Sequence, residues 1–469
     1  MSKVRKKGLN PYFLVILSFI VVILIGSLLL VMPWAQKSGQ WAFNHYIDCF
    51  FTAVSATCVT GLCSYADGLR GTFTVGGQIV VLAMIQVGGL GFITILTFII
   101  TIFKAKLNFK NRYLLSQAVN STSFADVGKF VKKIIFISFI IETFGFLLGL
   151  PVFFTMFPHN PAEAIWNSLF TSVSAFNNAG FELFGNTSLL RGDPATLIGG
   201  LYAEHTWAYY YLLSYIMILI ILGGISFLVI IEVFSFKKRP KQYRAFTKIV
   251  LLTSGFLLLF GFICFYLFDG IKVGDDVTSF DALFQSVTTR TAGFASCDQY
   301  NLSIGSRVTT CVLMFIGGSP LGTAGGIKTT TFFVIIIAML SYLRGKNVTA
   351  FKRKYSTNMI VKAMSLVFLA FFTCIIAYTG MTAFDGDQLE TAGFTKDTLM
   401  FETFSAFGTV GLSTGITPLI SVGSKLILCV LMFLGRLGPM TFFQIFQRTL
   451  DNKNVSDHFD LVEEDFLIG

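Results

Sequence analysis

The sequence predicts an all-α polytopic membrane protein in which one structural unit occurs four times. The 469-residue chain is 54% hydrophobic and only 13% charged, with a mean hydropathy of +0.73. Soluble globular proteins are about 25% charged. Its basic residues gather in segments between pairs of long apolar runs, and a short motif ending in glycine recurs at nearly even spacing.

Eight apolar segments approach or exceed the roughly 20 residues that a helix needs to cross a bilayer. Helices are expected because isolated strands leave backbone polar groups unsatisfied in lipid. The segments are 11–33, 74–103, 134–157, 206–234, 249–268, 309–343, 360–384 and 425–446, of which 309–343 is interrupted by glycines. The first follows the basic stretch MSKVRKKGLN but is long for a signal peptide, so we interpret it as a retained span.

The net charge of +10 is better explained by membrane topology than by a nucleic-acid partner. Most of the 35 Lys and Arg residues lie near the N-terminus, in 104–133, 237–248 and 344–362, and in the tail. Acidic segments (269–281 and 385–390) lie between them. This is the positive-inside pattern. It predicts a multi-pass protein of the cell membrane, surrounded by lipid, with both termini in the cytoplasm.

Four short segments lie between the paired spans, on the predicted outer side. They read FTAVSATCVTGL (51–62), FTSVSAFNNAGF (170–181), FQSVTTRTAGF (284–294) and FETFSAFGTVGL (401–412). At about ten residues each is too short to span a bilayer, so a re-entrant segment is expected. Three copies place Phe ten residues, Ser six and Ala five residues before a glycine, and the third copy is one residue shorter.

The glycines that end these segments are Gly61, Gly180, Gly293 and Gly411, spaced 119, 113 and 118 residues apart. A fixed period indicates internal repetition. We predict units at 1–112, 113–245, 246–355 and 356–469. The copies share one orientation, so the axis should follow the membrane normal, unlike that of inverted-repeat transporters. An alternative explanation is that the Gly, Ser and Ala residues only allow helices to pack closely. It is adequate for one such segment, but it explains four aligned copies less well.

Each segment is expected to enter as a helix and to return as an extended loop. The helix C-terminus carries partial negative charge, which favours a cation at mid-membrane. Glycine lets a carbonyl turn inward, and four loops can form carbonyl rings that replace the water shell of an ion. The fold predicted is therefore four span–pore helix–span repeats around a pseudo-fourfold axis. Its filter residues are Val59, Thr60, Gly61, Asn178, Ala179, Gly180, Thr291, Ala292, Gly293, Thr409, Val410 and Gly411. They include no carboxylate, which favours a monovalent cation over calcium.

The span of the third unit contains MFIGGSPLGTAGGIKTTTFFV, residues 314–334. Glycine costs up to about 1 kcal/mol and proline about 3 kcal/mol in a helix interior, so the helix should open into a loop. Such a loop is tolerated at membrane depth only where it lines water or is buried in protein. A phosphate cradle is disfavoured because the Walker spacing is missing. The gating candidates are Gly317, Gly318, Gly325, Gly326 and Lys328. Lys328 is expected to repel ions or to snorkel to the interface.

Two arginines lie in membrane segments. Arg436, in CVLMFLGRLGPMTFF, lies mid-span, where arginine is costly and usually functional. We predict a gate or an electrostatic barrier, the alternative being a carbonyl partner that only holds helices together. Arg290, three residues before Gly293, is expected to brace the loops. It is not expected to bind the ion, since a positively charged side chain in the path would block the passage of a cation.

The four short segments that end in a glycine, together with GGSPLGTAGGIKTTTF, resemble the corresponding segments of a superfamily of potassium transporters. This superfamily includes the bacterial Trk and Ktr membrane subunits and their plant (HKT) and fungal relatives. The resemblance covers essentially the whole chain, and the early first repeat favours the Ktr type. It implies a pseudo-fourfold pore, potassium as the ion bound at the filter residues, and sodium dependence in some members. It further implies that 317–326 is a gating loop, that a positive residue at Arg436 faces the pore, that the membrane part is a homodimer and that a separate cytoplasmic ring binds nucleotide.

The resulting prediction is potassium uptake through a four-loop selectivity filter under control of that ring, with no organic cofactor in this chain. The alternative is a symporter coupled to sodium or protons, for which Glu142 and Glu232 are the intramembrane carboxylates noted. An enzyme is disfavoured because the eight cysteines and four histidines form neither CxxC nor HExxH patterns and no nucleophile–base pair appears.

Overall fold

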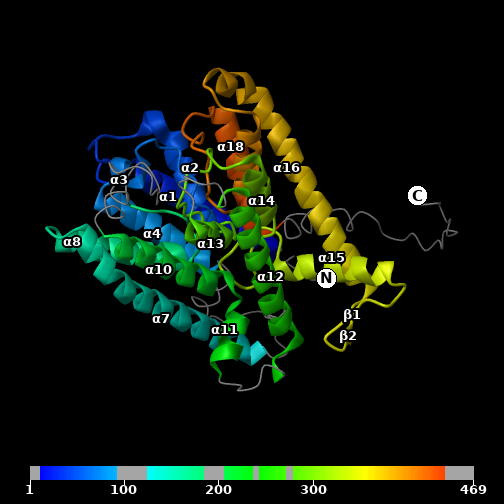
Figure 1. The fold of residues 1–469 in the computed structure, drawn as a ribbon. Helices are drawn as coiled ribbons and strands as arrows, with labels where there is room; N and C mark the ends of the chain where they lie inside the picture. Colours follow the sequence, from blue (N-terminus) through cyan, green and yellow to red (C-terminus); the bar gives the residue numbers. More distant parts are fainter. Residues whose placement is uncertain (1–10, 92–123, 184–204, 236–241, 271–277, 439–469) are drawn as a thin grey trace, which may run out of the picture.

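Four helical units follow one another along the chain in the computed structural model, which describes residues 11–91, 124–183, 205–235, 242–270 and 278–438 (Figure 1). Each unit contains a first long helix, a short helix and a second long helix. The first unit holds α1 (Pro11–Val31), η1 (Phe43–His45), α2 (Tyr46–Cys58), α3 (Gly68–Thr72) and α4 (Val75–Leu90). The second holds α7 (Phe124–Met156), α8 (Pro161–Phe176), α10 (Thr206–Gly224) and α11 (Phe227–Phe234). The third holds α12 (Ala245–Phe268), α13 (Ser279–Thr288), α14 (Ile304–Phe315) and α15 (Thr329–Leu343). The fourth holds α16 (Thr357–Thr391), α17 (Asp397–Gly408) and α18 (Val422–Leu437). The exact boundaries of the four units stay a prediction.

A small hairpin is the exception to the helical fold within the described residues. Strands β1 (Thr349–Ala350) and β2 (Arg353–Lys354) pair antiparallel between α15 and α16. Phe351 and Lys352 at its turn both have positive φ, as a tight two-residue hairpin turn requires. This hairpin was not predicted from the sequence.

The long helices have the size and surface of membrane spans. Within the part of the chain that the structure describes, four are long and apolar enough to cross a bilayer, namely the Val131–Met156 part of α7, α10, α12 and α16. Apolar side chains such as Phe256 and Leu259 of α12 are more than half exposed, which suits a lipid environment. The predicted spans 74–103 and 425–446 extend beyond the described residues. The basic N-terminal stretch, the tail and part of the basic segments 104–133 and 237–248 also lie outside them.

The second long helix of every unit is interrupted or ends within the described residues. The helices α4 and α18 end at Gly91 and Gly438, which have φ of +75° and +81°. As predicted, the third unit breaks after α14, and in Figure 1 α15 runs across the direction of α14. The apolar segment 206–234, expected to be a span, forms two helices, because α10 ends at Gly224 and α11 begins at Phe227. There the backbone turns extended at Ile225, and the N–H of Phe227 donates to Leu321 O of the third unit at 3.0 Å.

The C-terminal parts of the four short helices (α2, α8, α13 and α17) are buried among the long ones. Every residue from 51 to 60 and from 401 to 410 is buried. Glycines of the second helices allow this close approach. A Cβ added at Gly88, Gly223 or Gly435 would lie less than 3.0 Å from the carbonyl oxygen of Thr57, Phe176 or Phe407, respectively. Each of these carbonyls belongs to the fourth residue before a loop glycine, so one packing rule recurs in three units.

Replacement of Gly223 by alanine tests this packing rule. The added methyl group would collide with Phe176 O and push α10 away from α8, at an expected cost of about 1–3 kcal/mol. Gly223→Ala should therefore lower the melting temperature of the detergent-purified protein. Gly255→Ala is the matched control, because nothing lies within 4 Å of an added Cβ at this position of α12. An unchanged melting temperature for Gly223→Ala would contradict the packing rule.

Candidate functional site

The four loops that follow the short helices have one backbone conformation. The second residue before each loop glycine is left-handed: Val59, Asn178, Thr291 and Thr409 have φ between +49° and +73°. The glycines themselves have φ of +101°, +69°, +82° and +92° in chain order. Two such conformations within three residues reverse the carbonyl direction, and glycine adopts the second at little cost. We call the four segments 59–61, 178–180, 291–293 and 409–411 the loop ring.

The loop ring is a closed cycle. A Cβ added at Gly61 would lie less than 3.0 Å from Ala179 O, and one at Gly180 would lie that close to Ala292 O. The same holds for Gly293 against Val410 O, and for Gly411 against Thr60 O. Each loop thus packs its glycine against the carbonyl of the next loop in chain order, and the fourth packs against the first. The structure brings all twelve predicted filter residues together in this cycle.

A hydroxyl from each short helix supports the loop that follows it. Ser55 Oγ and Ser405 Oγ accept from the N–H of Gly61 and Gly411, both at 3.1 Å. In the middle two units the direction is reversed. There Ser174 donates to Phe181 O at 2.6 Å, and Thr288 donates to Phe294 O at 2.5 Å. The serine that recurs six residues before the glycine therefore has a structural function, and Thr288 replaces it in the third unit.

The third copy is one residue shorter because its helix ends differently. In three units the N–H before the loop glycine bonds to the carbonyl five residues earlier, for example Val410 N to Ser405 O at 2.9 Å. In the third unit Ala292 N bonds to Thr288 O, only four residues earlier, at 2.9 Å. The deletion therefore leaves the loop geometry unchanged.

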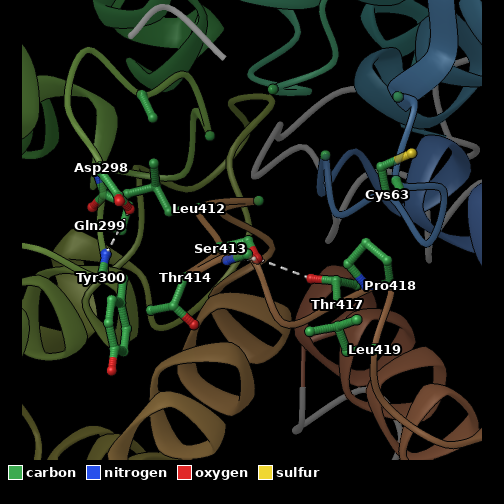
Figure 2. Close-up of a pocket in the computed structure, with 18 of the residues that line it drawn as sticks. Cys63, Asp298, Gln299, Tyr300, Leu412, Ser413, Thr414, Thr417, Pro418 and Leu419 are labelled. Atoms are coloured by element: carbon green, nitrogen blue, oxygen red, sulfur yellow. Dashed lines mark hydrogen bonds between the residues drawn. The ribbon is translucent and has the colours of Figure 1, made fainter. Parts of the chain in front are cut away.

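On one side of the loop ring lies a cavity of about 730 Å³. Its lining includes all four loop glycines, together with Phe181 and Leu412 directly after the second and fourth of them. In Figure 2, Cys63 of the first unit and Tyr300 of the third lie on opposite sides of the view, with Ser413 and Thr417 of the fourth unit between them. The cavity gives a solute access to the carbonyls of the ring from this side.

A buried carboxylate that the sequence analysis missed fixes one wall of the cavity. Glu402 of α17 is fully buried and accepts hydrogen bonds from Ser413 Oγ at 2.6 Å, Thr414 N at 3.1 Å and Thr417 Oγ1 at 3.1 Å. It anchors the segment just after Gly411. An acidic residue inside an otherwise apolar re-entrant segment, Phe-Glu-Thr-Phe, was the signal that could have found it.

On the opposite side of the loop ring lies the α14–α15 loop, residues 316–328. It bonds to the end of α10, through Ser319 N to Gly224 O and Thr323 N to Gly223 O, both at 3.1 Å. It also lies against the ring, since a Cβ at Gly325 would collide with Thr409 Oγ1. Most residues of this loop are buried, so it packs tightly beneath the loop ring.

Three cationic side chains hold the α14–α15 loop by its carbonyls. Arg436 of α18 donates to Thr323 O in the loop, and to Gly88 O and Gly89 O at the end of α4. Lys328 Nζ donates to Ala324 O at 2.6 Å and Gly325 O at 3.3 Å, so it closes the loop on itself. Arg290, directly before the third loop, donates to Gly317 O at 3.0 Å, as expected of a brace.

The two intramembrane carboxylates noted in the sequence differ in their surroundings. Glu142 of α7 is buried and accepts from Gln86 Nε2 at 2.9 and 3.0 Å and from Asn177 Nδ2 at 3.1 Å. It thus lies directly behind the second loop. Glu232, at the end of α11, instead bonds to Thr247 Oγ1 and to Arg244 N, and so connects α11 to α12.

Comparisons with known proteins agree on one family. Residues 5–457 match the TrkH family, described as cation transport protein. The chain is 36% identical to Ktr system potassium uptake protein B of Bacillus subtilis, over 94% of each chain. It is 33% identical to potassium/sodium uptake protein NtpJ of Enterococcus hirae, over 100% of this chain and 99% of the relative. The crystal structure of the potassium transporter TrkH from Vibrio parahaemolyticus has a similar fold, with a TM-score of 0.67 and 16% identity, covering 95% of this chain and 86% of that one.

Replacement of Glu402 by alanine tests its anchoring of the cavity wall. The change removes the acceptor of Thr414 N–H and of two hydroxyls, and each buried polar group left unsatisfied costs about 1–3 kcal/mol. Glu402→Ala should speed amide hydrogen exchange at Thr414 and lower the melting temperature. Glu390→Ala is the control, because Glu390 is exposed and pairs only with Lys396, at 3.2 Å. Wild-type protection of Thr414 in Glu402→Ala would exclude the anchoring role.

Proposed function

The chain belongs to the TrkH family of cation transport proteins, and we propose that it takes up potassium ions through the loop ring. The curated relatives named above are potassium uptake proteins, and one is also named for sodium uptake. The coarse function, uptake of potassium or sodium across a membrane, follows from these full-length relatives. The finer proposal assigns the selectivity to the twelve residues of the loop ring.

The cyclic packing of glycine against carbonyl carries this proposal. Carbonyl oxygens directed to one axis can replace the hydration shell of a monovalent cation. The four carbonyls before the loop glycines lie in such a cycle, and the glycines leave no room for a side chain between them. The C-termini of four short helices surround the ring, and their partial negative charge favours a cation there.

We propose that the α14–α15 loop and Arg436 form the gate below this filter. Arg436 connects the loop to the end of α4 by three backbone carbonyls, so movement of either α4 or α18 would move the loop. Gly317, Gly318, Gly325 and Gly326 allow the compact loop conformation, since a Cβ at Gly317 would collide with Gly325 O. Lys328 keeps the loop in this shape, and its charge adds to the barrier for a cation.

The regulation follows the Ktr type in this proposal. We propose a homodimer in the cell membrane, with lipid on its apolar surface and both termini in the cytoplasm. A separate cytoplasmic ring that binds nucleotide would act on the gate. The exposed basic residues around the hairpin, such as Arg344 and Lys352, give an anionic surface of such a ring a place to bind.

A symporter is the second candidate function, and Glu142 is the observation that favours it. Its buried carboxylate accepts a hydrogen bond from Asn177 beside the second loop. Binding of a sodium ion or a proton to this carboxylate would therefore affect the position of a filter loop. Rubidium uptake in a cell that lacks its own potassium uptake, with and without sodium and with and without a ring partner, distinguishes the two functions. Uptake that needs no sodium and does not change with the proton gradient would exclude coupling.

Replacement of Gly411 by serine tests the filter. A Cβ at this position would collide with Thr60 O, and a φ of +92° is strained for any residue but glycine. Gly411→Ser should therefore reduce the preference for potassium over sodium in a flux assay. Gly415→Ser is the control, because Gly415 has a similar φ of +88° but nothing within 4 Å of an added Cβ. Unchanged selectivity in Gly411→Ser would overturn the filter assignment.

Replacement of Arg436 by alanine tests the gate. The change removes a charge below the filter and frees the α14–α15 loop from α4. Arg436→Ala should raise potassium uptake or make it less dependent on the ring partner. Lys37→Ala, which changes an exposed basic residue between α1 and η1, should leave both unchanged. Wild-type rate and wild-type regulation in Arg436→Ala would count against the gate.

A further inference from the structure

Each of the four short helices carries one acidic residue in its first turn. These residues are Asp48 in α2, Glu163 in α8, Asp281 in α13 and Asp397 in α17. A carboxylate is favourable at a helix N-terminus, because the helix dipole is positive there. The four acids lie at different distances in sequence from the loop glycines, so the repeat alignment does not bring them into one register.

In three dimensions the four acids have the same kind of partner. Each bonds to a donor from the unit before it in the cycle, in or just before the second helix of that unit. Asp48 pairs with Lys425 of α18 at 2.7 Å. Glu163 pairs with Arg70 of α3, which leads into α4. Asp281 accepts from Tyr209 Oη of α10 at 3.1 Å, and Asp397 pairs with Arg307 of α14 at 3.1 Å.

These contacts cross every interface between neighbouring units. They join the fourth unit to the first, the first to the second, the second to the third and the third to the fourth. We call them the four clasps. Each clasp lies at the end of a short helix opposite to the loop ring. The helices joined by three of the clasps also pack against one another (α2 with α18, α10 with α13 and α14 with α17), and α8 packs against α4, which follows α3.

We propose that the four clasps are positioning residues for ion selectivity, because each fixes the short helix of one unit against the second helix of the unit before it. This inference rests on the proposed function of the loop ring as a filter. A short helix of 12 residues such as α17 is about 18 Å long. A shift at its N-terminus is transmitted to the carbonyls at its C-terminus, because buried helices move as rigid bodies.

The clasp between the second and third units differs chemically from the other three. Tyr209 and Asp281 are both fully buried, and the donor is a neutral hydroxyl. Asp281 also accepts from Thr278 N at 2.9 Å and from Thr278 Oγ1 at 2.5 Å. A neutral donor at this interface keeps a second charge out of the most buried clasp, where desolvation costs most.

Charge reversal across the third-to-fourth interface tests the inference. The variants are Asp397→Arg, Arg307→Asp and the double variant with both changes. The readouts are the half-saturation concentrations for rubidium and sodium, the maximal rates and the amount of protein in the membrane. Each single reversal should shift the rubidium-to-sodium preference about threefold or more, in the range of coupling between contacting residues. The double variant should restore it.

The matched control is Glu390→Lys, which reverses one charge of the Glu390–Lys396 pair. This pair joins residues of the fourth unit only, close to α17, so its loss should leave the preference unchanged. Tyr209→Phe is the second variant, because it removes only a hydroxyl and keeps the aromatic ring in place. It should shift the preference in the same direction, even if a charge-reversed protein fails to reach the membrane.

Gly411→Ser in the same assay distinguishes failure of the clasp inference from failure of the filter assignment. If Gly411→Ser changes the preference while neither the reversals nor Tyr209→Phe does, the clasps do not position the filter and the inference is overturned. If none of the variants changes the preference, the filter assignment itself fails. A double reversal that stays as defective as the single variants would also overturn the inference, because it would show that pairing is not what matters.

Discussion

The contact on which the rest of this structure depends is the approach of each loop glycine to the carbonyl of the neighbouring loop. Four such contacts close a cycle, and none leaves space for a Cβ. Because every loop contacts the next, no unit can adjust its loop alone. The surrounding structure serves this constraint: hydroxyls from the short helices support the loops, and glycines of the second helices let the short helices approach.

The same backbone that forms the loop ring also contacts the α14–α15 loop, the proposed gate. Gly325 of the α14–α15 loop lies against Thr409, and Thr323 Oγ1 is 3.4 Å from Phe176 O at the end of α8. In the proposed mechanism, the filter and the gate therefore share contacts. A movement of the loop that opened the path would also remove a support from the ring, so the selectivity of the open state would depend on the hydroxyls and helices behind the loops.

The repeated elements, and the helix break that glycines and a proline mark in the third unit, could be predicted from the sequence, whereas features that depend on contacts between distant segments could not. Glycine, serine and phenylalanine recur in register because each of the four loops needs the same geometry, and a period of this kind is visible in a single chain. The break after Gly224 was missed because 206–234 is apolar throughout, and because a contact from Leu321 of another unit stabilises it. Glu402 was missed because hydrogen bonds with three residues beyond the loop satisfy it, and these contacts depend on folding. The acids of the clasps share no register, because only their partners in space make them equivalent.

The contact between Asp48 and Lys425 has a consequence for biosynthesis. These residues are 377 positions apart, so the first short helix meets its partner only when the last unit has been made. At a translation rate of about 5–20 residues per second this takes on the order of 20–75 s. During that time the growing chain holds fewer than four complete units, so polar groups that are buried in the complete fold, such as Thr60 and Ser55, must remain in the membrane without the fourth unit. Nascent chains of this protein therefore have a period in which insertion factors, or premature association with a second copy, affect whether they fold correctly.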